Sequence, residues 1–167
     1  MKRFFTSVDR AVEALVLVIF VLMVIVGGMQ VFNRYVLNKS LSWSEEFQKF
    51  THVWLVYLAI PIGYRRGSHI GMDVIRRLFP EKLQTVLEML TNLLWLLLAG
   101  VMVYYTLVIM TVARRQTSPG MGIRMDHVYL GLVIGGAYLA FVVLRQLFFG
   151  EFTAEREERG PEIEGAE

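Results

Sequence analysis

Three ionisable side chains on one predicted helix are the first candidates for chemistry in this sequence. Glu45, Lys49 and His52 are spaced i, i+4 and i+7, so they share one face of a helix. One interpretation is an interfacial ion pair with a histidine below it, worth about 0.2–0.5 kcal/mol. The other is a face buried against another protein chain, because Ala59 and Gly63 continue it with small residues and polar groups avoid lipid. The second interpretation is favoured, and a proton relay through His52 is a further hypothesis.

Two histidines raise the question of a haem. His52 and His127 both lie near the outer end of a predicted helix, and haem iron accepts axial histidine ligands. His127, however, adjoins Asp126 at the mouth of its helix, where solvation is the simpler explanation, and His69 lies in a polar loop. We therefore expect no cofactor and no metal. A haem-binding membrane anchor of a respiratory enzyme is kept as an alternative function.

The remaining polar residues show no catalytic pattern. The sequence holds no nucleophile–base pair, no phosphate-cradling loop and no cysteine, so we expect no enzymatic activity. The net charge of +2 gives no reason to expect a nucleic-acid partner. One polar segment carries cations that we expect to set the topology and to meet anionic lipid headgroups at the cytoplasmic surface: Arg65, Arg66, His69, Arg76 and Arg77.

The elements that must position these residues are membrane helices. Of the 167 residues, 55% are hydrophobic and 19% are charged, against about 45–50% and about 25% in an average soluble domain. Because the apolar residues are bunched into four blocks, we predict an all-α integral membrane protein with four transmembrane helices in a single domain, residues 1–150. The predicted spans are about 11–33, 43–64, 84–113 and 126–149, with a short interfacial amphipathic helix near 74–79 and a charged, disordered cytoplasmic tail, 151–167.

Local motifs refine these helices. Ser42 and Glu45 have the spacing of a capping box at the start of the second span. Pro61 predicts a kink in that span, and Pro80 is expected to open the third helix. In the fourth span, Gly131 and Gly135 form a small-xxx-small pair that predicts close helix–helix packing.

The Lys and Arg residues predict the orientation. Of 17 such residues, 11 flank the side that holds both termini, five flank the other side, and Lys49 lies within the second helix. The positive-inside rule then puts both termini in the cytoplasm. The start of the second helix and the QTSPGMGIR turn, 116–124, therefore face outward.

An ordered set of motifs carries a family resemblance over 8–149. WSEE at 43–46 opens the second helix, RGSHIGMD at 66–73 follows it, and Pro80 comes next. This arrangement resembles the small permease subunit of tripartite ATP-independent periplasmic (TRAP) transporters. The resemblance implies a bacterial inner-membrane protein that forms a fixed scaffold beside a large subunit, which carries the substrate and sodium sites and moves as an elevator. It also implies a periplasmic binding protein that delivers an organic acid of the C4-dicarboxylate, keto acid or sialic acid type.

The same resemblance implies where partners bind. The outward end of the second helix is expected to meet the large subunit or the docking binding protein through Trp43, Ser44, Glu45, Glu46, Lys49 and His52. A self-sufficient small oligomeric transporter remains the second alternative. The spans offer no buried carboxylate pair and no pair of broken half-helices, which are the usual marks of a transport site.

Overall fold

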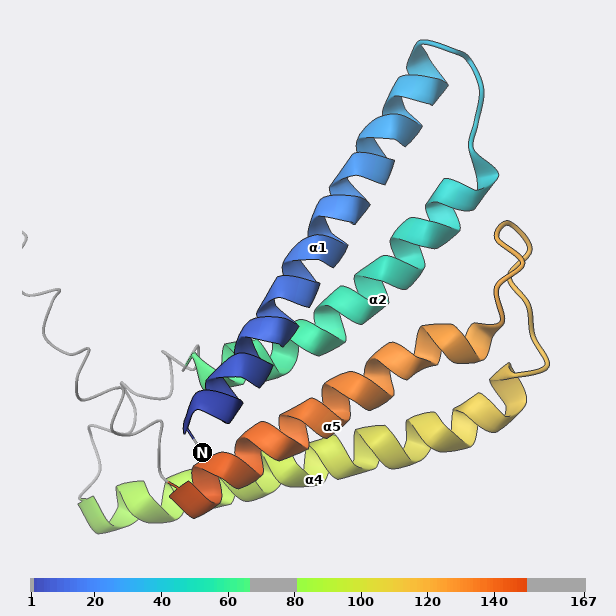
Figure 1. Cartoon of the computed structure of the whole chain (residues 1–167). Coiled ribbons are helices and arrows are strands. Elements are labelled where there is room, and N and C mark those ends of the chain that lie inside the picture. The colour runs from blue at the N-terminus through green and yellow to red at the C-terminus, as the bar shows by residue number, and fades with distance from the viewer. Residues whose placement is uncertain (1, 67–80, 150–167) are drawn as a thin grey trace, which may run out of the picture.

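Four α-helices make up most of the computed structural model, which describes residues 2–66 and 81–149. Figure 1 labels them in chain order. Their bounds are α1, Lys2–Tyr35; α2, Ser42–Arg65; α4, Glu81–Ala113; and α5, Met125–Phe149. The described residues include no strand, only an isolated β-bridge between Thr117 and Arg124. The all-helical prediction is confirmed for this part of the chain.

Three of the four helices are long and apolar enough to cross a membrane. They contain the candidate spans Phe5–Tyr35, Val86–Ala113 and Met125–Phe148. The predicted span 84–113 lies within α4, and 126–149 starts one residue inside α5, but α1 begins well before residue 11. The helix α2 is not among the candidate spans, so its crossing of the membrane stays a prediction.

Several predictions lie outside the described residues. They are the amphipathic helix near 74–79, the position of Pro80, the loop side chains His69, Arg76 and Arg77, and the tail 151–167.

The predicted capping box is wrong. The helix begins at Ser42 itself, so the N-cap is Leu41, which offers no side-chain hydrogen bond. A capping box requires the serine at the N-cap, and Ser42 is one position too far into the helix. Ser44 supplies a different local contact, since its Oγ donates to the Leu41 carbonyl at 2.7 Å.

The helices contact one another in the order α1–α2–α5–α4. Figure 1 shows the α1–α2 pair inclined to the α4–α5 pair, with the N-terminal end of α1 close to α5. In the central helix α5, 44% of the most apolar 18-residue segment is buried, whereas none of the corresponding segment of α1 is buried. The core lies where α2, α4 and α5 meet and comprises Tyr64, Ala99, Tyr138, Leu139, Val142 and Val143.

Glycines let α5 approach both neighbours. A Cβ added at Gly131 would lie 2.8 Å from the Trp54 ring, and one at Gly135 would lie 2.4 Å from the Tyr57 carbonyl oxygen, both on α2. A Cβ at Gly136 would instead lie 2.6 Å from the Met102 side chain on α4. These distances are too short for a real Cβ. The packing of α5 against α2 and against α4 therefore depends on glycine at these three positions.

Candidate functional site

Six side chains from α1, from α2 and its C-cap residue, and from α5 form a charge cluster near the N-terminal end of α1. We call it the Asp9 cluster: Asp9, Glu13, Arg65, Arg66, Tyr138 and Arg145. Asp9 is 3% exposed and accepts a hydrogen bond from the Tyr138 hydroxyl at 2.7 Å. Its other carboxylate oxygen, Oδ2, lies 2.7 Å from Arg65 and 3.0 Å from Arg145. Three helices therefore meet at one buried carboxylate.

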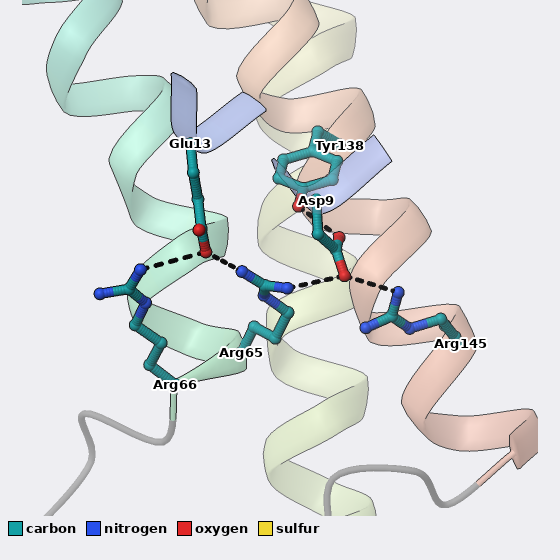
Figure 2. Close-up of polar contacts among 6 residues, drawn as sticks. All are labelled: Asp9, Glu13, Arg65, Arg66, Tyr138 and Arg145. Carbon is teal, nitrogen blue, oxygen red and sulfur yellow. Dashed lines mark hydrogen bonds and ion pairs between the residues drawn. The ribbon is translucent and has the colours of Figure 1, made fainter. Parts of the chain in front are cut away.

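Opposite charges alternate through the Asp9 cluster. Figure 2 shows Glu13 between Arg66 and Arg65, and Asp9 between Arg65 and Arg145. The Arg66–Glu13 distance is 3.1 Å, and Arg65 is paired with both carboxylates. Because each carboxylate lies between two guanidinium groups, the cluster compensates its buried charges internally, as buried charges require.

The sequence prediction treated part of this cluster as surface. Arg65 and Arg66 were expected to act as topology determinants, and the structure pairs both with acidic residues of α1. Arg145, which is among the 11 basic residues counted at the predicted cytoplasmic flank, is 6% exposed. One signal in the sequence points to the α5 side, since Gly131, Gly135, Tyr138 and Arg145 follow helical spacing along a single face.

Glu46 binds the turn between α4 and α5 at the opposite end of α2. Its carboxylate accepts hydrogen bonds from Ser118 Oγ at 2.7 Å and from the backbone amides of Gly120 at 3.0 Å and Met121 at 2.9 Å. In the same turn Gly122 has φ +66°, a conformation that favours glycine. We call this contact the Glu46 anchor. It ties the α4–α5 turn to α2, so Glu46 has an intramolecular role that its predicted partner role did not include.

Replacing Glu46 by Ala is expected to free this turn. Hydrogen bonds to a charged acceptor are stronger than those to a neutral one, so the amides of Gly120 and Met121 should exchange several-fold faster once the carboxylate is removed. Hydrogen–deuterium exchange of the purified chain measures this directly. Glu45→Ala is the control, because Glu45 is exposed and makes no hydrogen bond to the turn. Equal exchange in the two variants would contradict the anchor.

The other predicted partner residues lie on different faces of α2. Glu45, Lys49 and His52 are exposed and share one face. Ser44, in contrast, is fully buried, and Trp43 is half-buried with an edge-on contact to Phe47. The structure therefore keeps Glu45, Lys49 and His52 together and separates Ser44 from them.

The structure does not bring the two candidate haem ligands together. Trp54 faces Gly131 on α5, and His52 precedes it by two positions, which is about 200° around the helix. The Nδ1 atom of His127 lies 3.0 Å from Oδ1 of Asp126, at hydrogen-bond distance. Across residues 2–66 and 81–149, no three His, Cys, Asp or Glu side chains are grouped so that they could hold a metal ion.

Most buried polar side chains in the described residues are engaged within the chain, which limits what this site can do chemically. The six buried polar side chains in the described part of the chain are Asp9, Ser44, Thr106, Ser118, Asp126 and Arg145, and each has a bonding partner. A hollow of about 400 Å³ between α1, α2 and the start of α5 is lined mainly by apolar side chains such as Ile19, Phe50 and Trp54. These features suit bracing of helices better than recognition of a polar solute.

Comparison with known proteins gives a consistent family match. Residues 22–150, well over half of the chain, match the family described as tripartite ATP-independent periplasmic transporters, DctQ component. A TRAP transporter small permease protein of Haemophilus influenzae is 25% identical over 136 residues, 81% of this chain and 82% of that protein. The C4-dicarboxylate TRAP transporter small permease protein DctQ of Pseudomonas aeruginosa is 33% identical over 66 residues, 40% of this chain and 31% of that protein.

A further relative is a much longer polypeptide. The isethionate TRAP transporter permease protein DctMQ of Oleidesulfovibrio alaskensis is 28% identical over 107 residues, which are 63% of this chain and only 17% of that protein. In that protein the segment similar to this chain is therefore continuous with a far larger permease.

Proposed function

The chain belongs to the DctQ component family of tripartite ATP-independent periplasmic transporters, and we propose that it is the fixed scaffold of the large permease subunit in such a transporter. Members of this family are components of transporters rather than enzymes. Its apolar helices agree with a multi-pass protein of the inner membrane. The fused relative supports association with a large permease subunit.

The proposed topology has four crossings. In this proposal α2 is the second crossing, both termini are cytoplasmic, and residues 1–150 form one membrane domain followed by a charged tail, 151–167. Tyr64 donates to Asn92 on α4 at 2.6 Å, and Gln48 donates to Gln30 on α1 at 2.6 Å. These contacts support a position of α2 inside the bundle, because polar side chains within a membrane pair with one another.

The observation that carries the scaffold role is the Asp9 cluster. It joins α1, α2 and α5 through charges that are already paired inside the chain. A moving or substrate-binding element would need polar groups that can change partners, whereas a scaffold needs groups that keep them. We propose that substrate and sodium bind in the large subunit and that the cargo is an organic acid.

The outward end of α2 is the proposed docking region. In the proposed topology, Trp43 and Glu45 lie at the periplasmic surface beside the Glu46 anchor, which fixes the neighbouring turn. Together these residues offer a firm, partly acidic surface for a periplasmic substrate-binding protein.

Reconstitution tests this function. The large permease subunit of the same transporter, supplied with the binding protein and a sodium gradient in proteoliposomes, is expected to take up substrate only when this chain is present. The chain should also co-purify with the large subunit. Normal uptake by the large subunit without this chain, or uptake by this chain alone, would refute the scaffold role.

A further inference from the structure

One face of α2 is exposed or only partly covered within the described bundle. Its residues follow alternating steps of three and four along most of the helix, and we call them the α2 stripe: Glu45, Lys49, His52, Val56, Ala59 and Gly63. The opposite face holds the fully buried Leu58 and Pro61. On the stripe, Val56 is 39% exposed, and a Cβ at Gly63 would meet nothing within 4 Å.

The chemistry of the α2 stripe does not suit lipid. At 1.5 Å per residue, His52 lies about 15 Å from Ser42 along the helix, so in the proposed topology it lies in the outer half of the membrane, below the headgroups. Ionisable side chains at such depth face protein or water rather than acyl chains. Within residues 2–66 and 81–149, no hydrogen bond or ion pair holds Glu45 or His52. The exposed faces of α1 and α4 differ, since they are lined by large apolar side chains such as Leu17, Val24 and Leu97.

The spacing of the α2 stripe suits packing against another helix. An average step of 3.5 residues keeps a face turned toward a neighbouring helix that crosses at about 20°. Small residues such as Ala59 and Gly63 let membrane helices approach closely. The 24 residues of α2 extend about 36 Å, enough for contact across the full bilayer.

We propose that the α2 stripe receives one transmembrane helix of the large permease subunit along its whole length. This proposal rests on the proposed function and names the surface through which the scaffold is attached. The long relative, in which a segment similar to this chain is continuous with a larger permease, identifies the class of partner. A covered stripe also explains why α2, which is less apolar than the other helices, can lie among three membrane-spanning helices.

Cross-linking of the intact transporter complex tests the proposal. The sequence has no cysteine, so single cysteines can be introduced at Lys49, Val56 and Gly63 and labelled with a benzophenone maleimide. Irradiation is expected to give an adduct with the large subunit, seen as a gel shift, from all three positions. Cysteines at Leu17 on α1 and Leu97 on α4, both exposed, are the controls and should give no such adduct.

The outcomes separate this proposal from the proposed function. Adducts from Leu17 or Leu97 but not from the α2 stripe would overturn the proposal while the scaffold role stands. Adducts from Lys49 without Gly63, or adducts with a second copy of this chain, would also overturn it. Failure of the two subunits to co-purify would refute the scaffold role itself. As a second measurement, Gly63→Leu should reduce co-purification, whereas Gly28→Leu, at an equally open position on α1, should not.

Discussion

Asp9→Asn is expected to lower the stability of the isolated chain by about 3–5 kcal/mol, because it removes the carboxylate that compensates buried guanidinium groups. Arg145 is 6% exposed and lies 3.0 Å from Asp9, so its charge has little access to water once that carboxylate is neutralised. The asparagine keeps the shape of the side chain, so the loss reports charge rather than packing. For a chain of this size we expect Tm in detergent to fall by about 10 °C.

Asp126→Asn is the matched control for this variant. Asp126 is also buried, but its partners Arg124 and His127 are 51% and 59% exposed and can turn to water. Its replacement should therefore lower Tm much less than that of Asp9, because its partners can be solvated once the carboxylate is neutralised. Asp9→Asn combined with Arg145→Gln should be more stable than Asp9→Asn alone, because the stranded charge is removed too. Similar losses of Tm for Asp9→Asn and Asp126→Asn would show that the Asp9 cluster is not the main polar contact that stabilises the helix bundle.

Gly135→Ala is expected to destabilise the chain by about 1–3 kcal/mol through overpacking of the contact between α2 and α5. The added Cβ would lie 2.4 Å from the Tyr57 carbonyl oxygen, and backbone cannot yield as a side chain can. Gly136→Ala should cost less, because its Cβ would meet side chains, Met102 at 2.6 Å and Val103 at 2.8 Å, rather than backbone. The measurement is the midpoint of thermal or denaturant unfolding in detergent.

The same substitution at Gly100 should have the opposite sign. No atom lies within 4 Å of a Cβ added there, so Gly100→Ala gains about 0.5–1 kcal/mol from its greater helix propensity. The contrast tests packing directly, since the chemical change is identical at both positions. A loss at Gly100 as large as that at Gly135 would mean that glycine acts through the helix backbone rather than through the α2–α5 contact.

The helices could be predicted from the sequence because their information is local. The long uncharged run ending at Ala113 and the Pro/Gly turn after it define the end of α4, and the observed bound agrees. The spacing of Gly131 and Gly135 likewise identified a face of α5 that lies against α2. The start of α2 was misread, because the conformation of Leu41, rather than the spacing of Ser42 and Glu45, determines the N-cap.

The Asp9 cluster could not be predicted from the sequence, because its contacts are not local. Asp9 and Arg145 are 136 residues apart in the chain, and no local pattern joins them. Charge counting assigns Arg65 and Arg145 to a membrane flank, which is compatible with their role in orientation but says nothing about pairing. The inclination of α1 toward α5, visible in Figure 1, brings Asp9 and Arg145 together.

The long separation of Asp9 from Tyr138 and Arg145 also sets an order for membrane insertion. During synthesis α1 and α2 emerge first, so Asp9 can meet Arg65 well before α5 exists. Tyr138 and Arg145 arrive last and complete the coordination of the carboxylate. The final helix therefore completes the Asp9 cluster, and we expect the bundle to become resistant to proteolysis only after α5 has been inserted.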